Sequence, residues 1–288
     1  GRGDTFRMTP LGVHFGEAGK TVEDPYFGGV GPARTGCTNC GECMTGCRHG
    51  AKNTLVKNYL YLAEQAGALV VAETTVADIR EPAEGGFELS VRGSSAWRGS
   101  GQRSIRAGQV IVSAGALGTA KLLQKVRAGG NLQGLSDRLG HLSRTNSESL
   151  LGVVARGDDV DYSQGAAITS SIFPSPDTHI EPVRYGKGSN FMAMMQSVMA
   201  SGKAGQNPNP LRLIWATITN LHRLPSFYNL RDWSERTLIL LVMQARDNSL
   251  VTKLRWGLFG RRLTSAQGHG EKNPAWVPAG HEVARELA

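Results

Sequence analysis

The spacing of apolar residues between positions 51 and 107 predicts one helix followed by an antiparallel ribbon. Apolar residues recur at helical spacing, as expected for a helix with one buried face, at Val56, Tyr59, Leu60 and Ala63. Gly67 follows and is expected to end this helix, because glycine readily adopts the left-handed conformation found at helix ends. Strands are expected at 69–72, 75–80 and 87–91, and through Ile105.

Residues 107–123, AGQVIVSAGALGTAKLL, predict a buried strand, a glycine turn and the start of a helix. The run VIV at 110–112 has the apolar character of a parallel strand that is buried on both faces. The small residues that follow it are Ser113, Ala114, Gly115 and Ala116. A turn without bulky side chains lets a ligand approach the strand ends, where open α/β sheets usually bind. The alternative is an ordinary strand-to-helix turn.

The second half of the chain has longer apolar runs that predict a mostly antiparallel sheet. The expected strands are 150–155, 165–173, 191–199 and 237–245, interrupted by an amphipathic helix at about 211–224. A hairpin is expected at 252–256 and 261–265, around Gly257 and Gly260. The predicted fold class is therefore α/β plus α+β.

Composition and charge narrow the class of protein. The 288 residues are 40% hydrophobic, with a formal net charge of +8 and a mean hydropathy of −0.25, and they contain no apolar stretch long enough to span a bilayer. Lys and Arg are scattered and no basic groove with interleaved aromatic residues is evident, so we expect no nucleic-acid partner. We expect a cytoplasmic protein.

One basic group could rest on a membrane surface. Its members flank Trp256 and Phe259 in the predicted hairpin and are Lys253, Arg255, Arg261 and Arg262. The alternative, which we favour, is a charged hairpin in water. The chain also opens with GRGDTFRMTP, which lacks an initiator Met, and stops at HEVARELA, so we expect a fragment of a longer protein.

All four cysteines lie in one short segment. Their spacing, CxxCxxCxxxC, resembles the iron–sulfur run of bacterial ferredoxins and comprises Cys37, Cys40, Cys43 and Cys47. In those proteins the fourth cysteine usually ligates a second cluster, and here Arg48 replaces the following Pro. Four interpretations stay open: an iron–sulfur cluster, a zinc site, one or two disulfides, or reduced thiols packed as small apolar groups.

Three stretches in one order resemble the glucose-methanol-choline (GMC) flavoprotein oxidoreductases, and within them the cholesterol oxidase-like branch. They are GAKNTLVKNYLYLAEQAGA at 50–68, TVADIRE at 75–81, and VIVSAGALGTAKLL at 110–123 followed by LSDRLGHLSRTNSE at 135–148. Motifs at family-like separations are more specific than a single glycine turn. The resemblance covers most of the chain and is strongest from Gly50 to Glu148.

The resemblance implies a partial FAD-binding domain interleaved with an antiparallel-sheet substrate domain. Residues 1–50 would form a substrate-domain or cap segment that carries the cysteines, residues 51–140 part of the FAD-binding domain, and residues 141–288 the substrate-binding domain. The implied activity is oxidation of a 3β-hydroxysteroid, or a similar secondary alcohol, by hydride transfer to FAD. The implied partner is a sterol-like small-molecule alcohol.

The resemblance also implies roles for individual residues. Val76 would meet the adenosine end of FAD through its backbone, and Ser113 to Ala116 would lie against the cofactor. Glu181 stands where this branch carries a glutamate over the steroid, and it would move a proton during double-bond isomerisation. The alternative for Glu181 is a surface acid or a salt bridge with Arg184. The cluster of methionines at 192–199 would line the sterol pocket or belong to the core.

Two parts of the family pattern are absent from the sequence. The GxGxxG unit is missing from residues 1–50, and the closing segment with the active-site His and its His or Asn partner is missing as well. None of the seven histidines is therefore assigned a catalytic role. We expect this chain alone to be inactive, with the N- and C-terminal parts of the same enzyme as its partners. The alternatives are an iron–sulfur electron-transfer module and a non-catalytic flavoenzyme remnant.

Overall fold

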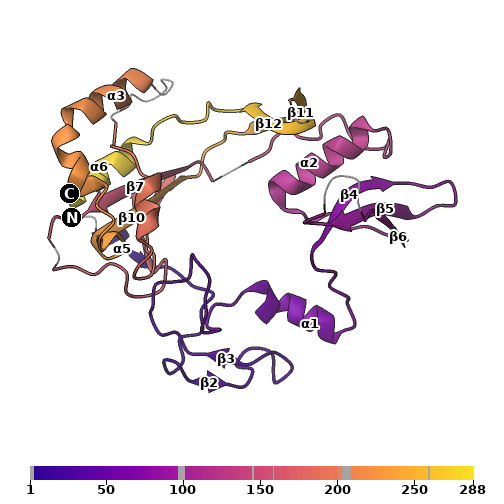
Figure 1. Ribbon diagram of the computed structural model, residues 1–288, viewed down its shortest axis with the longest axis horizontal. Coiled ribbons are helices and arrows are strands. Elements are labelled where there is room, and N and C mark those ends of the chain that lie inside the picture. Colours follow the sequence, from indigo (N-terminus) through magenta and orange to yellow (C-terminus); the bar gives the residue numbers. More distant parts are fainter. Residues whose placement is uncertain are drawn as a thin grey trace. The chain divides into compact units, whose positions relative to one another are not determined.

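The computed structural model describes residues 3–96, 101–144, 146–157, 159–200, 202, 209–258 and 260–288, which form two compact units. Unit 1 comprises Gly1–Ala68, Asn146–Arg246 and Pro274–Ala288, and unit 2 comprises Leu69–Thr145 and Asp247–Asn273. The chain therefore leaves unit 1 and returns to it twice, as expected for interleaved domains. Figure 1 labels many of the helices and strands of both units. The assignment of 51–140 to a cofactor domain and of the remaining segments to a substrate domain stays a prediction.

Unit 1 is built on a five-stranded sheet whose strand order is β1-β8-β9-β10-β7. Its strands are β1 (Arg7–Met8), β7 (Glu148–Val154), β8 (Ser170–Ser175), β9 (Thr178–Val183) and β10 (Thr237–Gln244), and all their pairings are antiparallel. Strand β10, with the sequence TLILLVMQ, is apolar on both faces, and each of its residues is buried or half-buried in its place between β7 and β9. The predicted antiparallel sheet of the second half is confirmed.

Helix α6 (Pro278–Leu287) covers one face of this sheet. The buried core of unit 1 lies here and consists of Ile180, Leu240, Val242, Val277, Val283 and Ala284. A Cβ at Gly280 would stand 2.7 Å from Cγ2 of Val242, so the helix approaches the strand closely at this glycine. Pro278 occupies the first turn of α6, where its missing N–H removes no helical hydrogen bond. Helix and sheet therefore form one packed layer pair.

The first 68 residues of unit 1 are mostly irregular. They contain η1 (Gly3–Thr5), β2 (Thr21–Val22), β3 (Arg34–Thr35), η2 (Leu55–Lys57) and α1 (Tyr59–Gln65). Arg34 is fully buried, and its guanidinium donates to the carbonyl oxygen of Pro32 at 3.0 Å, to Oδ1 of Asn53 at 3.1 Å and to the carbonyl oxygen of Lys57. One buried cation therefore joins the strand to the segment before α1.

Unit 2 contains a three-stranded antiparallel sheet, a helix and a hairpin. The elements are β4 (Thr74–Arg80), β5 (Phe87–Gly93), β6 (Arg103–Ala107), α2 (Gly115–Ala128), β11 (Leu250–Gly257) and β12 (Gly260–Gln267). Helix α2 contacts both β4 and the hairpin. Nε2 of Gln124 on α2 donates to the carbonyl oxygen of Thr252 at 2.9 Å. Side chains of α2 thus join the hairpin to the rest of unit 2.

Several predicted elements are confirmed and others are wrong. The strands at 75–80 and 87–91, the helix after Gly115 and the hairpin around Gly257 and Gly260 are present. Residues 69–72 and 110–112 form no strand, and Ile111 is 90% exposed. Among the described residues no strand pairs with 110–112, so its apolar side chains lack the neighbours that a doubly buried strand needs. The helix before Gly67 exists, but Val56 and Tyr59 are exposed rather than buried.

The segment between β9 and β10 also differs from the prediction. Residues 191–199 were expected to form a strand, but Asn190–Met195 form the 3-10 helix η3. The predicted amphipathic helix is present as α3 (Pro210–Thr219), followed by η4 (Leu221–Arg223) and α4 (Leu224–Phe227), and α5 (Trp233–Arg236) precedes β10. No helix in the described ranges is both long and apolar enough to cross a membrane.

Candidate functional site

The sheet face opposite α6 forms one wall of an apolar cavity of 390 Å³ in unit 1. Side chains alternate along a strand, so Ile239 and Leu241 of β10 line this cavity while Leu240 and Val242 belong to the core under α6. The other apolar lining residues include Met44, Leu150, Val183, Met192, Met195, Met199, Phe227 and Trp233. Polar groups are few and include Glu148, Tyr185, Gln196 and Thr237. An apolar cavity with a few polar groups is the usual form of a small-molecule site.

Three of the four methionines predicted for a pocket line the cavity. These are Met192, Met195 and Met199, whereas Met194 does not line it. Exposure does not separate them, because Met195 is 79% exposed and Met194 is 56% exposed. Phe191 is 78% exposed. Because these residues form a 3-10 helix and not a strand, they do not follow the expected alternation of faces.

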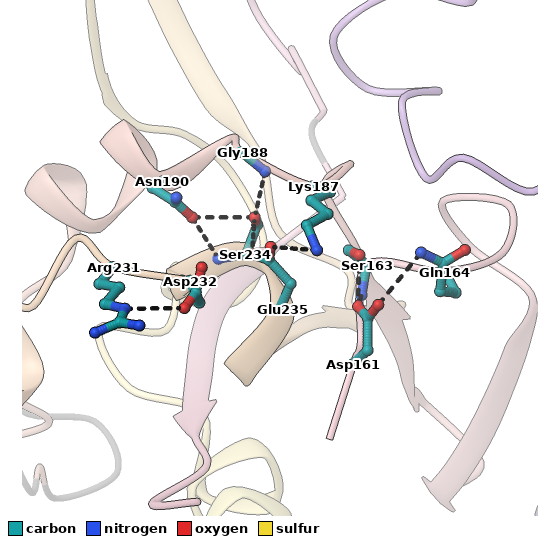
Figure 2. A network of polar contacts seen from close by, with 10 residues as sticks. All are labelled: Asp161, Ser163, Gln164, Lys187, Gly188, Asn190, Arg231, Asp232, Ser234 and Glu235. Atoms are coloured by element: carbon teal, nitrogen blue, oxygen red, sulfur yellow. Dashed lines mark hydrogen bonds and ion pairs between the residues drawn. The ribbon is translucent and has the colours of Figure 1, made fainter. Parts of the chain in front are cut away.

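A buried polar network holds the segment that carries Trp233 (Figure 2). The backbone N–H of Ser234 donates to Oδ1 of Asn190 at 2.9 Å, and the Ser234 hydroxyl donates to Oε2 of Glu235 at 2.7 Å. Nζ of Lys187 lies 3.8 Å from Oε1 of Glu235, whose side chain is largely buried. Burial of this carboxylate is tolerable because it has both a hydrogen bond and a cation beside it.

This network fixes one wall of the cavity. The indole Nε1 of Trp233 donates to Oε1 of Gln196 at 3.2 Å, and Nε2 of Gln196 donates to the carbonyl oxygen of Phe227 at 2.6 Å. All three residues line the cavity. No sequence pattern indicates this role. The segment WSER at 233–236 has no periodicity, and its two charged residues, which are buried here, are of a kind usually found in exposed segments.

Glu181 lies beside this cavity but does not line it. It is half-buried on β9, opposite Leu241 of β10, and shares a strand face with Val183 two residues away. Both Val183 and Leu241 line the cavity. Within the described residues, no ion pair joins Glu181 to Arg184. The catalytic role of Glu181 stays a prediction.

Unit 2 contains a separate hollow of 600 Å³. It is lined by β4, by residues 110–114 and by the side of α2 that carries Gly118, Lys121 and Lys125. Of the predicted cofactor residues, Val76, Ser113 and Ala114 line this hollow, whereas Gly115 and Ala116 are exposed at the start of α2 and do not. Their cofactor contacts stay a prediction.

The start of α2 has open space and uncapped N–H donors. Gly115 has a φ of +70°, which favours glycine, and a Cβ at this position would meet no atom within 4 Å. Within the described residues no side chain caps the helix, although the backbone N–H of Ala114 donates to Oγ1 of Thr119 at 3.1 Å. Nζ of Lys125 donates to the carbonyl oxygen of Ala77 at 2.6 Å, which ties the helix to β4. Uncapped N–H groups at a helix start attract anions.

The four cysteines are free thiols that line one cavity of about 10 Å³ in unit 1. Burial raises the pKa of Cys37. Burial also acts to raise the pKa of Cys47, but backbone N–H groups, first that of Lys52, outweigh it and lower the pKa. In the described part of the chain no group of three or more His, Cys, Asp or Glu side chains could hold a metal ion. The structure therefore gives no support to the iron–sulfur or zinc interpretations, or to an electron-transfer module based on them.

Trp256 of the basic hairpin is 77% exposed. Arg261 places its guanidinium 5.1 Å from the ring centroid of Trp256, so one of the basic residues is engaged with the aromatic residue that it flanks. Phe259 lies outside the described residues. The predicted membrane contact is not supported.

The sequence of the chain is similar to that of a known family of proteins. Residues 30–142 match the family model of GMC oxidoreductases. The whole chain is 50% identical over 299 residues to cholesterol oxidase from two strains of Mycobacterium tuberculosis, of which it covers 52%. It is 43% identical over 301 residues to cholesterol oxidase from Acinetobacter baumannii. This alignment includes all of this chain and covers 53% of that relative. The chain spans about half the length of these relatives. The resemblance expected from the sequence is confirmed, and the two interleaved units agree with a partial fold of this kind.

Proposed function

We propose that this chain supplies the alcohol-binding cavity and one side of the flavin site of an FAD-dependent oxidoreductase. Its residues 30–142 match the family model of GMC oxidoreductases. The substrate class is a sterol-like secondary alcohol. The observation that carries this proposal is the apolar cavity of unit 1, because its lining suits a rigid hydrocarbon skeleton. The names of the relatives point to the same chemical class.

The sheet face and the methionines of the cavity have complementary parts in binding. Ile239 and Leu241 stand on a hydrogen-bonded strand and give a firm apolar surface. Met192 and Met195 have flexible side chains that adapt to the shape of a ligand. Polar groups such as Tyr185 and Gln196 offer hydrogen bonds to a hydroxyl group and would orient it.

The hollow of unit 2 fits part of FAD. Its apolar strand residues suit a flat ring system, and Arg92 and Lys121 add positive charge that suits the pyrophosphate. The uncapped start of α2 presents N–H groups and the unobstructed Gly115, so a phosphate or ring edge can come close to the backbone. Val76, Ser113 and Ala114 would hold the cofactor through their backbones, with Gly115 and Ala116 beside them. When bound, FAD supplies the hydride acceptor.

Glu181 is the proposed proton carrier for double-bond isomerisation. Its place on the same strand face as Val183 puts it next to the cavity wall, and its partial burial suits a carboxyl group that exchanges a proton. In the longer protein that contains this chain, Glu181→Gln should leave alcohol oxidation intact and reduce isomerisation by about 100-fold or more, in the range usual for loss of a general base. Unchanged isomerisation would remove Glu181 from the proposal.

Sterol binding to the chain itself tests the cavity. Dehydroergosterol absorbs light at the wavelengths that tryptophan emits. Its binding beside Trp233 should therefore quench tryptophan fluorescence, and the quenching should saturate as the sterol concentration rises. Gly152 lines the cavity, and a Cβ there would meet its nearest atom, Cγ2 of Thr237, at 3.8 Å. Gly152→Phe therefore projects a ring into the cavity without an immediate backbone clash, and should weaken binding at least about tenfold, which corresponds to about 1.4 kcal/mol.

Gly12→Phe is the matched control. A Cβ at Gly12 also meets its nearest atom at 3.8 Å, on Asn53, and Gly12 does not line the cavity. Its affinity should equal that of the wild type. Equal affinity of the Gly152 variant and the wild type would refute the assignment of the cavity. The absence of saturable binding to the wild type would favour a non-catalytic remnant.

A further inference from the structure

The cysteine segment brings all the thiols of the chain to one place. Cys37, Cys40, Cys43 and Cys47 are half-buried, unbridged and arranged around one cavity of about 10 Å³. A cavity of this size holds at most about one water molecule. The four cysteines therefore line one small cavity, and the proposed oxidation of an alcohol uses none of them.

The backbone of this segment is fixed against the rest of unit 1. Cys40 forms a parallel bridge with Gly165, whose N–H donates to the carbonyl oxygen of Asn39 at 2.7 Å. Gly41 has a φ of +70°, and a Cβ at Gly41 would lie 2.0 Å from the carbonyl oxygen of Ser163. Only glycine fits this close approach. The thiols are thus held near one another before any reaction, which reduces the entropy lost when two of them become linked.

Two sulfurs of the cluster accept hydrogen bonds from the backbone, that of Cys37 from the N–H of Asn39 at 3.4 Å and that of Cys47 from the N–H of Lys52. The N–H of Lys52 donates to Sγ of Cys47 at 3.5 Å, and Nζ of Lys52 donates to the carbonyl oxygen of Cys43 at 2.9 Å. Backbone N–H donors stabilise negative charge that develops on a sulfur during nucleophilic attack. Burial raises the pKa of Cys37, whereas burial at Cys47 is outweighed by the backbone N–H groups of Lys52 and the three residues before it, which lower the pKa. Cys47 is therefore the favoured first nucleophile.

We propose that the cluster is a reversible oxidation site at which a peroxide converts Cys47 and one neighbouring cysteine to a disulfide. The Cys47 thiolate attacks one peroxide oxygen, the O–O bond breaks, and sulfenic acid forms while the other oxygen leaves as hydroxide, which is protonated to water. A second thiol of the cluster then attacks the Cys47 sulfur, an S–S bond forms, and the sulfenic oxygen leaves as water. Two electrons pass from the two sulfurs to the peroxide. A dithiol reductant reverses the change.

The modification bears on the cavity of unit 1 through Met44. This residue stands between Cys43 and Cys47 and lines that cavity. A disulfide closing on Cys47 would restrain the segment that carries Met44, and sterol affinity would then differ between the reduced and oxidised chain. This consequence rests on the proposed function, whereas the disulfide itself does not.

Intact-mass analysis of the chain, purified under reducing conditions and then treated with hydrogen peroxide, tests the proposal. Formation of the disulfide should lower the mass by about 2 Da, reduce the number of alkylated thiols by two, and be reversed by dithiothreitol. Cys47→Ser should slow this change at least about tenfold. Thr45→Ser, at an exposed position of the same segment, should react like the wild type.

Other outcomes would overturn the proposal. They are an unchanged wild-type mass, oxidation to sulfinic acid without loss of two thiols, or stoichiometric iron or zinc in the purified chain. The wild-type result stands even if the Cys47 variant does not fold. Dehydroergosterol titration of the reduced and oxidised chain separates the two proposals, because failure of sterol binding would leave the mass result unaffected.

Discussion

The contact between Gly280 of α6 and Val242 of β10 predicts a non-additive pair of substitutions. Val242 is fully buried, and its Cγ2 lies 2.7 Å from where a Cβ at Gly280 would stand. Gly280→Ala should cost about 1–3 kcal/mol of unfolding free energy through overpacking, offset by up to about 1 kcal/mol of helix propensity. Val242→Ala should cost about 2–3 kcal/mol, because it removes two buried methyl groups worth about 0.8 kcal/mol each and leaves a cavity.

The double variant should be more stable than the sum of the single changes implies. The methyl group that Gly280→Ala introduces enters the space that Val242 vacates, so each change relieves the damage of the other. We expect a coupling of about 1–2 kcal/mol, within the range found for residues in contact. Urea unfolding followed by tryptophan fluorescence measures all four corners of the cycle. Gly12→Ala is the control partner, because a Cβ there meets its nearest atom at 3.8 Å and it should be additive with Val242→Ala. Additivity of the Gly280 pair to within about 0.5 kcal/mol would refute this packing of α6.

Two pH dependences follow from the structure. Partial burial raises the pKa of Asp24, but four backbone N–H groups of the following turn outweigh it and lower the pKa to about 2, from an ordinary value of 3.8. The carboxylate therefore stabilises the turn fully above pH 3.8 and loses this effect as the pH falls toward 2. Asp24→Asn should remove that acid step from amide hydrogen exchange of the turn, and an unchanged step would contradict the assignment. Burial, and then Arg285, lower the pKa of His281 below 6.5, so its neutral form stabilises the fold above pH 6.5 and that stability declines as the pH falls through the lowered pKa. His281→Leu should flatten the decline of the urea unfolding midpoint between about pH 7 and about pH 5. An unchanged decline in this variant would show that other groups cause it.

Elements with strong local signals could be predicted from the sequence. The hairpin β11–β12 was predicted because Gly257 and Gly260 lie between two runs of strand-forming residues. Strand β10 was predicted from an apolar run of strand length, and the glycine turn before α2 from its small residues. In each case the information lies within the segment itself, so no knowledge of a partner was needed.

Elements that depend on a distant partner could not be predicted in this way. The run at 110–112 has the composition of a buried strand, but composition cannot supply the neighbouring strands, and Ile111 is exposed. Strand β9 was not predicted, and it contains Pro182, a residue that is unusual within a sheet. Pro182 lies beyond the described β8–β9 pairs, which end at Ile180, and is in register with Leu240 of β10.

The candidate site shows the same division. The methionines and the small residues near 113–116 are recognisable in sequence because their composition is unusual. Trp233 and Gln196 are not recognisable, because their place in the cavity wall comes from hydrogen bonds between segments that are about 40 residues apart. Family resemblance identified the class of protein, whereas the cavity wall required the structure.

The strand order of unit 1 has a consequence for how the protein is made. Strand β7 has β10 as its hydrogen-bonded neighbour in the sheet, and β10 follows it about 80 residues later in the chain. At about 5–20 residues per second, a ribosome would add β10 about 4–16 s after β7. During that interval the backbone N–H and C=O groups of β7 lack their partner strand, whereas the β8–β9 hairpin can form at once. The nascent chain should therefore carry an open sheet edge for seconds, and its yield in cells should depend on chaperones that shield such edges.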